Sequence, residues 1–211
     1  MKQDFPVFFK RYIELFPFLH TPRFVDLTYG LLEMFWDENQ LGDVPQLDVP
    51  FIAMAAGLHD IGKSVLAPSL ANPTGALTPV ERAVFETHTM LGAVMLSSVG
   101  LPRFEDSRIY QYGWQICLSH HERWDGCGYP QKLKGDQIPP YVQVVSLADQ
   151  YDRLRTPRPN RSAYPHKQAM ERILAARGAF APQMLACFAK VMTDDTVAII
   201  YPEGTTQKYA H

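Results

Sequence analysis

The chain has few cysteines and no long hydrophobic run. Its 211 residues include three cysteines, Cys117, Cys127 and Cys187, with no CxxC spacing. A disulfide framework and a structural zinc knuckle are therefore not indicated, which favours a reducing compartment. No run of about 18 apolar residues is present, and the first residues lack the charged-then-apolar pattern of a secretory signal. The sequence therefore predicts a soluble cytoplasmic protein that does not act on or in a membrane.

A strong excess of charge of either sign is also missing. The formal net charge is -2, whereas proteins that bind nucleic-acid polymers usually carry a strongly basic face. We therefore expect no DNA or RNA partner, and an anionic substrate would have to be held locally. With 46% hydrophobic residues, the chain is long enough for one well-buried core, and we expect a single domain over residues 1–211.

Apolar residues recur at helical spacing along most of the chain. The segment that opens at Thr21-Pro22 has a clear apolar face, and Thr78, Pro79 and Glu81 form the pattern of a capping box with proline at the first helical position. Only residues 196–201 look strand-like. The fold class predicted is all-α. The expected helices cover residues 7–15, a segment from 21 onward, 49–58, 78–90, 91–99, 105–120, 141–155, 164–176 and 181–192.

Histidines and aspartates stand at the ends of several of these apolar segments. Alone, each would be an ordinary core histidine or a surface acid, but helices that converge can bring such residues to one metal site. Imidazole and carboxylate together suit manganese, iron, cobalt or zinc. The residues in question are His59, Asp60, His88, His120, His121 and Asp149.

The amino-acid sequences of the segments around these residues resemble the motifs of the HD superfamily of metal-dependent phosphohydrolases. Within this superfamily they resemble the HD-GYP family of cyclic di-GMP phosphodiesterases. The likeness covers roughly residues 15–192 and leaves a short C-terminal tail, 193–211. The matching segments are residues 20–25 (HTPRFV), 59–63 (HDIGK), 121–130 (HERWDGCGYP), 133–139 (LKGDQIP), 148–152 (ADQYD) and 158–161 (RPNR).

The resemblance implies an HD-domain helical bundle with a binuclear metal site in its interior. It implies that two metal ions, iron or manganese, activate a water molecule for attack on a phosphodiester. Asp60 would bridge the metals, and Lys63 would place a cation near the phosphate, although a lysine there could equally serve the helix end. The implied ligands are His20, His59, Asp60, His88, His120, His121 and Asp149.

Three further residues are implied to bind the substrate. Tyr129 would stack on a nucleobase, although it could equally pack its loop, and Arg158 and Arg161 would pair with phosphate, although exposed arginines are usually solvated. The expected activity is hydrolysis of a cyclic dinucleotide, cyclic di-GMP above all, to the linear dinucleotide. The alternatives are an HD phosphohydrolase of another nucleotide or another cyclic dinucleotide, a non-catalytic HD-type module that binds nucleotide or protein, and oxygenase chemistry on an HD di-iron site. A homodimer or a signalling-protein partner stays open.

The sequence also departs from the family pattern. Gln143 stands where an arginine is common and Asn160 where a tyrosine is usual, so we expect altered substrate affinity or preference. Phe16 stands where members with a third metal carry a glutamate, which predicts two metals rather than three. Only about 19 residues precede His20, so no attached regulatory domain is expected within this chain.

Overall fold

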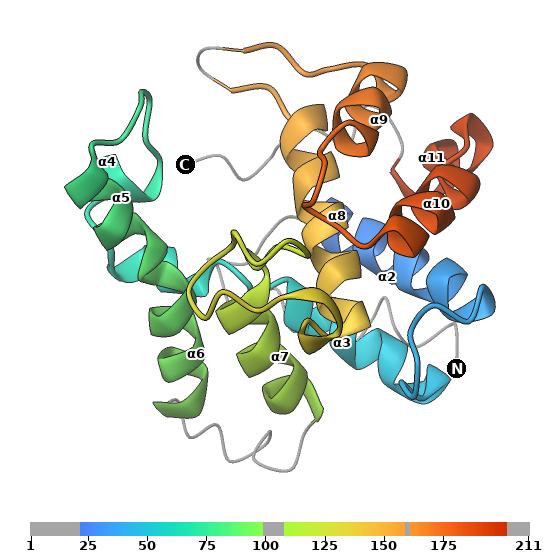
Figure 1. Ribbon diagram of the computed structural model, residues 1–211, viewed down its shortest axis with the longest axis horizontal. Coiled ribbons are helices and arrows are strands. Elements are labelled where there is room, and N and C mark those ends of the chain that lie inside the picture. Colours follow the sequence, from blue (N-terminus) through green and yellow to red (C-terminus); the bar gives the residue numbers. More distant parts are fainter. Residues whose placement is uncertain (1–21, 99–107, 159–160, 202–211) are drawn as a thin grey trace.

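The computed structural model describes residues 22–98, 108–158 and 161–201 (Figure 1). Phe16, His20, Asn160 and the helix expected over residues 7–15 lie outside these ranges. Within them the chain is helical and forms no β-strand, which confirms the predicted all-α fold. The α-helices are α2 (Pro22–Asp37), α3 (Val49–Ala56), α4 (Pro68–Ala71), α5 (Pro79–Glu86), α6 (His88–Ser98), α7 (Arg108–Ser119), α8 (Pro140–Arg155), α9 (His166–Leu174), α10 (Pro182–Val191) and α11 (Asp194–Ile200). The 3-10 turns are η1 (Gln46–Asp48), η2 (Ile61–Val65) and η3 (Gly135–Gln137).

The core is built from the apolar faces of helices that cross at the centre of the molecule. Helix α2 packs against α3 and α8, α3 packs against α7, and α6 packs against both α7 and η2. Helix α8 runs through the middle of Figure 1, with α9, α10 and α11 on one side and α6 and α7 on the other. The apolar face predicted for α2 is buried, as its members Phe24, Val25, Leu27, Leu31, Leu32 and Phe35 are at most 1% exposed.

The helix expected over residues 78–90 is divided in two. Its start agrees with the sequence, since the Thr78 side chain accepts a hydrogen bond from the Glu81 amide and the Glu81 carboxylate accepts one from the Thr78 amide. The helix ends at Glu86, however, and α6 begins at His88. The Thr87 hydroxyl donates to the Val84 carbonyl at 2.6 Å, a local bond that competes with helix continuation. His88 therefore lies in the first turn of a new helix.

The strand-like segment at residues 196–201 is also helical, so that expectation was wrong. Thr193 caps α11, because its side chain accepts a hydrogen bond from the Thr196 amide. Asp194 and Asp195 place negative charge in the first turn, where it is favourable. With a cap at its start and no neighbouring strand among the described residues, the β-branched run folds as a helix.

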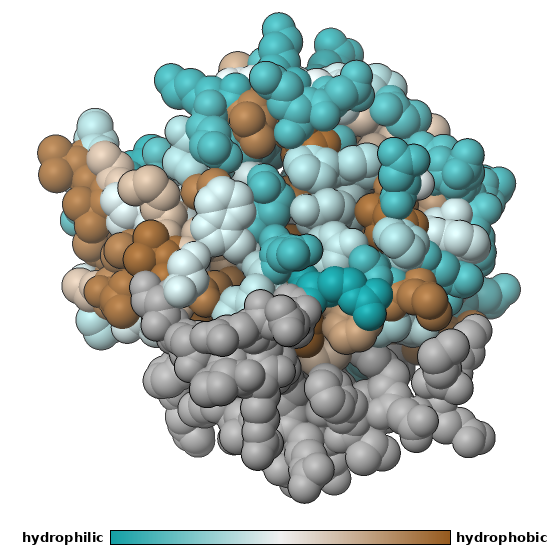
Figure 2. All heavy atoms as spheres, turned by 90° about the horizontal axis from the view of Figure 1, so that it is seen from below, coloured by the Kyte–Doolittle hydropathy of each residue, from teal (hydrophilic) through white to brown (hydrophobic). Residues whose placement is uncertain are grey.

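Helices α4 and α5 project from the body of the molecule (Figure 1), and no residue of α5 is buried. Seen from below, hydrophobic side chains gather on the side where α4, α5 and α6 lie (Figure 2). The exposed hydrophobic residues of this part of the chain are Val65, Val80, Val84, Met90 and Val94. None of the described helices has the length and apolarity needed to cross a membrane.

Candidate metal centre

Four of the predicted metal ligands meet at one point. Asp60, His88, His120 and His121 each offer one ligand atom, and these atoms all lie within 4.8 Å of one another. Asp60 follows α3, His88 begins α6, and the two adjacent histidines follow α7. The packing of α6 against α7 and of α3 against α7 brings the three segments together.

Two more of the predicted ligands border this group. Nε2 of His59 lies 3.5 Å from Oδ2 of Asp60 and 3.7 Å from Oδ1 of Asp149. Burial alone would raise the pKa of Asp149, but its interactions with His59 and Arg153 outweigh burial and lower the pKa below its ordinary value. The carboxylate is therefore ionised. The seventh predicted ligand, His20, lies outside the described residues.

The backbone fixes the tautomer of three of the histidines. Nδ1 of His59, His88 and His120 lies 2.7, 2.7 and 2.9 Å from a main-chain carbonyl oxygen three or four residues earlier in the chain. A carbonyl oxygen can only accept, so Nδ1 carries the hydrogen in each ring. Nε2 is then left with a lone pair, and this is the arrangement by which a histidine binds a metal.

The ring nitrogens of the grouped histidines are buried close to one another. Nε2 of His88, His120 and His121 is buried and has no hydrogen-bond partner among the described residues. Burial lowers the pKa of His88 and, more strongly, that of His121, which keeps both imidazoles neutral. Buried polar atoms without partners are costly in folded proteins. Neutral imidazoles grouped with a carboxylate are a donor set for a divalent transition metal, so the cluster fits such an ion.

A close backbone contact fixes the distance between two of these segments. Gly62 in η2 packs on the start of α6, and a Cβ at this position would lie 2.0 Å from the carbonyl oxygen of His88. Glycine is therefore required for the close approach of η2 to α6. The approach keeps Asp60, two residues earlier, next to His88, with 3.3 Å between Oδ1 and Nε2.

The loop after His121 folds around a buried carboxylate. Glu122 is 5% exposed and accepts hydrogen bonds from the amides of Gln131 and Leu133 at 2.7 and 3.0 Å. Burial raises the pKa of Glu122, and the amide donors partly offset this. Within the loop, the ring of Tyr129 lies against that of His121, with centroids 4.8 Å apart. The loop therefore places an aromatic ring beside the metal cluster.

An ion pair between Arg123 and Asp125 fixes the first part of the same loop. The guanidinium of Arg123 donates to both oxygens of Asp125, at 3.1 and 2.6 Å. This interaction lowers the pKa of Asp125 to about 2. The amide of Asp125 also donates to the carbonyl of Gly178, between α9 and α10. The loop is thereby fixed to the C-terminal half of the chain.

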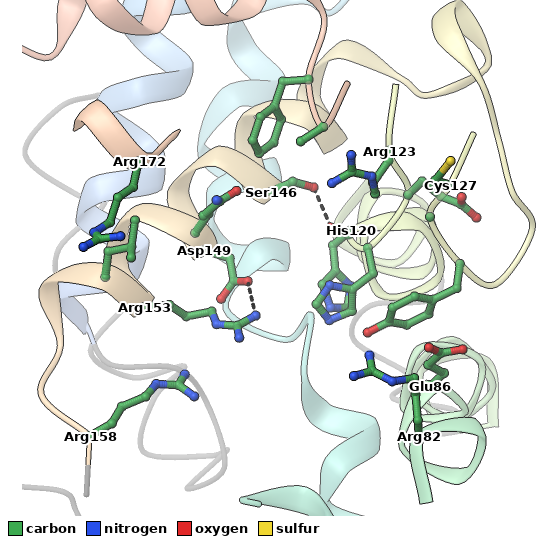
Figure 3. Close-up of a pocket in the computed structure, with 18 of the residues that line it drawn as sticks. Arg82, Glu86, His120, Arg123, Cys127, Ser146, Asp149, Arg153, Arg158 and Arg172 are labelled. Atoms are coloured by element: carbon green, nitrogen blue, oxygen red, sulfur yellow. Dashed lines mark hydrogen bonds and ion pairs between the residues drawn. The ribbon is translucent and has the colours of Figure 1, made fainter. Parts of the chain in front are cut away.

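A pocket of about 710 Å³ opens beside the histidines (Figure 3). Its lining includes His120, His121, Tyr129 and Asp149, so it reaches the metal cluster. The other titratable groups are mostly cationic, although the whole chain is slightly acidic. Six arginines line the pocket against three acids: Arg82, Arg123, Arg153, Arg158, Arg161 and Arg172 against Glu86, Glu122 and Asp149. The lining therefore suits an anion larger than one phosphate group.

The predicted phosphate-binding residues differ in whether they line the pocket and in whether their donors are free to bind a ligand. Arg158 lines the pocket. Arg161 also lines it, but its guanidinium donates to three main-chain carbonyls, at 2.5 to 3.3 Å, and packs on the Tyr164 ring. Nζ of Lys63 donates to Oδ2 of Asp60 and lies 5.3 Å from the ring centroid of Phe85, and this lysine is not among the residues that line the pocket.

The sequence analysis expected Gln143 to affect the substrate, but this residue does not line the pocket. Its side chain is buried, accepts a hydrogen bond from the Ala181 amide at 3.2 Å and donates one to the Ile138 carbonyl at 3.4 Å. Gln143 therefore ties α8 to the start of α10 and is not part of the pocket lining.

The sequence analysis missed several residues of the pocket. Arg82 and Glu86 come from α5, Arg153 from α8 and Arg172 from α9. Nη1 of Arg153 lies 3.8 Å from Oδ2 of Asp149. The only available signal was the four-residue spacing of Arg82 and Glu86 shortly before His88, because no motif contains these residues.

Comparison with known proteins gives consistent results. A family model described as "HD domain" matches residues 18–183. A cyclic di-GMP phosphodiesterase of Thermotoga maritima is 36% identical over 146 residues, which cover 69% of this chain and 38% of that protein. The cyclic di-GMP phosphodiesterase response regulator RpfG of Xanthomonas campestris is 38% identical over 140 residues, which cover 66% and 35%. A 3'3'-cGAMP-specific phosphodiesterase of Vibrio cholerae is 31% identical over 139 residues, which cover 65% and 26%.

A solved structure supports the fold. An HDG"Y"P protein from Bdellovibrio bacteriovorus superposes with a TM-score of 0.59 at 21% identity, over 80% of this chain and 51% of that one. The chain spans little more than a third of the lengths of the first two relatives named above.

Proposed function

Because this chain belongs to the HD-domain family, and within it to the HD-GYP group, we propose that it is a metal-dependent phosphodiesterase that hydrolyses a cyclic dinucleotide, with cyclic di-GMP as the expected substrate. The observation that carries the proposal is the cluster of Asp60, His88, His120 and His121 at the edge of an arginine-rich pocket. Hydrolysis of a cyclic dinucleotide, which carries two phosphodiester groups, needs a metal donor set beside a cationic cavity.

Seven residues are assigned to hold two transition-metal ions, iron or manganese. Bound there, such ions would lower the pKa of a water molecule and withdraw charge from phosphodiester oxygens. The Nδ1 hydrogen bonds of His59, His88 and His120 to the backbone keep the Nε2 lone pairs aimed at the cluster. The assigned ligands are His20, His59, Asp60, His88, His120, His121 and Asp149.

The pocket residues are assigned to bind and orient the dinucleotide. Arg158 and Arg161 supply positive charge for phosphate, with the larger share on Arg158, because the donors of Arg161 are bonded to the main chain. Lys63, bonded to Asp60, orients that carboxylate and adds a cation at the edge of the cluster. Tyr129 offers a ring for stacking of a base.

The remaining features of the proposal follow from the sequence. With two metals, the product is the linear dinucleotide. Residues 1–211 form one domain that acts in the cytoplasm, with neither a nucleic-acid polymer nor a membrane as partner, and a second copy or a signalling protein binds to it. Relatives named 3'3'-cGAMP-specific phosphodiesterases favour a second candidate substrate, the mixed dinucleotide.

The test is hydrolysis of a panel of dinucleotides by protein reconstituted with iron or manganese. Cyclic di-GMP, 3'3'-cGAMP and cyclic di-AMP are incubated with the protein, and the products are separated by chromatography. We expect a linear dinucleotide from cyclic di-GMP. No turnover of any cyclic dinucleotide by metal-loaded protein would refute the proposal.

A further inference from the structure

One side of the pocket carries two charged residues that the proposed phosphate chemistry does not use. Arg82 and Glu86 lie four residues apart on α5, so their side chains share one face of the helix. Both line the pocket. In Figure 3 they lie across from Arg153 and Arg158, with His120 between the two groups. The two sides of the pocket therefore present different chemistry to a ligand that reaches the metal cluster.

The acid on this side of the pocket has no hydrogen-bond or ion-pair partner among the described residues. Glu86 is half-buried, and its carboxylate makes no hydrogen bond or ion pair with another described residue. The same is true of the Arg82 guanidinium, although it lies one turn away. A half-buried carboxylate without donors is unfavourable, and it repels phosphate. The part of the ligand that contacts Glu86 must therefore supply hydrogen-bond donors.

We propose that Glu86 and Arg82 form a guanine-recognition site, in which Glu86 accepts hydrogen bonds from N1–H and the N2 amino group and Arg82 donates to O6 and N7. This inference rests on the proposed function, since it places the base of the bound cyclic dinucleotide. Guanine presents two adjacent donors followed by two adjacent acceptors, and arginine is well suited to O6 and N7. Enzymes that bind unpaired bases commonly recognise these edges.

Other bases do not match the same pair of side chains. Adenine has an acceptor at N1 and a single amino group at N6, so one oxygen of Glu86 would face a lone pair. It also has a donor where guanine has O6, which would face the Arg82 donors. Sites that leave a buried polar group unpaired reject such analogues strongly.

Tyr129 supports the site from the loop. It lines the same pocket, and its ring packs on that of His121. Tyr129 and Glu86 both line this pocket, which also reaches His120 and His121. An aromatic ring is a general platform for a base, so stacking and edge recognition can act on one guanine. Because the pocket that Glu86 lines also contains His120, His121 and Asp149, that guanine belongs to the nucleotide at the metal cluster.

The first experiment compares kcat/KM for cyclic di-GMP, 3'3'-cGAMP and cyclic di-AMP in the wild type, Glu86→Gln and Arg82→Met. We expect the wild type to prefer guanine substrates. Glu86→Gln should lower kcat/KM for cyclic di-GMP by about 10- to 100-fold and bring the ratio of cyclic di-GMP to cyclic di-AMP close to one. Glu171→Gln is the matched control, because Glu171 is exposed on α9 and does not line the pocket.

A second readout separates this inference from the proposed function. Binding of GMP and AMP is measured by calorimetry, with metal content and hydrolysis of bis(p-nitrophenyl) phosphate measured on the same samples. Wild type that cleaves the small diester but no cyclic dinucleotide would refute the function, while GMP binding about tenfold tighter than AMP would still support guanine recognition. Equal binding of GMP and AMP, equal losses on every substrate, or loss of metal in Glu86→Gln would overturn the guanine site.

Discussion

Replacement of Gly62 by alanine perturbs the metal cluster without removing any ligand. The added Cβ would lie 2.0 Å from the carbonyl oxygen of His88 and 2.6 Å from the amide nitrogen of Gly92, whereas real Cβ atoms essentially never approach closer than 3.0 Å. Both contacts are backbone atoms of α6, so no side-chain rotation relieves them. The closer contact requires η2 and the start of α6 to separate by about 1 Å.

The displacement falls between two predicted ligands. Asp60 lies two residues before Gly62, and His88 supplies the closest contact. Overpacking of this kind costs about 1 to 3 kcal/mol of stability, and a shift of about 1 Å in a catalytic constellation can cost about 100-fold in rate. We therefore expect Gly62→Ala to lose about 2 kcal/mol of unfolding free energy. Metal content and cyclic dinucleotide turnover should fall with it.

Urea denaturation, elemental analysis and turnover assays check this result against a matched variant. Gly75→Ala makes the same change at a position where a Cβ meets no heavy atom within 4 Å. That variant should match the wild type within about 0.5 kcal/mol. If Gly62→Ala behaved like Gly75→Ala in stability, metal content and turnover, the close contact would have no role in shaping the site.

Three further predictions concern the loop and the core. Tyr129→Ala should raise KM for cyclic di-GMP by about tenfold, with a smaller effect on bis(p-nitrophenyl) phosphate, because stacking contributes about 1 to 3 kcal/mol per base; equal effects on both would make the ring purely structural. Tyr201→Phe should lower the unfolding free energy by about 1.5 to 3 kcal/mol, since it removes a 2.6 Å hydrogen bond to the buried carboxylate of Asp152; unchanged urea denaturation would contradict this. The pKa of Asp125, about 2, lies below its ordinary 3.8, so its pairing with Arg123 contributes stability above pH 4 that is lost as the pH falls toward 2, and an NMR titration of the carboxyl with an ordinary midpoint would show that no such pair exists.

The fold was largely predictable because its signals are local. The apolar spacing of residues 22–37 and the capping box at Thr78 each act within one helix. The two errors occurred where local signals conflict. Nothing in the apolar pattern marks the helix break at Thr87, and the β-branched residues after Thr193 favour a strand until the cap and the acidic first turn are considered.

The candidate site was predictable only where its residues form a motif. Adjacent pairs such as His59 and Asp60 can be recognised in the sequence, and the structure brings six of the seven predicted ligands together. The pocket wall was not predictable, because tertiary packing decides that Glu86 on α5 and Arg172 on α9 face the same cavity. For the same reason Gln143, although close to a motif, turned out to be a structural residue.

The most direct test of the metal-dependent mechanism is the paired measurement of metal content and cyclic di-GMP hydrolysis in the wild type and Asp60→Ala. The wild type should contain close to two metal ions per chain and produce the linear dinucleotide. Asp60→Ala should remain folded by circular dichroism while metal and turnover are lost together. Full metal content and full turnover in folded Asp60→Ala would show that the reaction occurs elsewhere, and close to three ions per chain in the wild type would contradict the two-metal site.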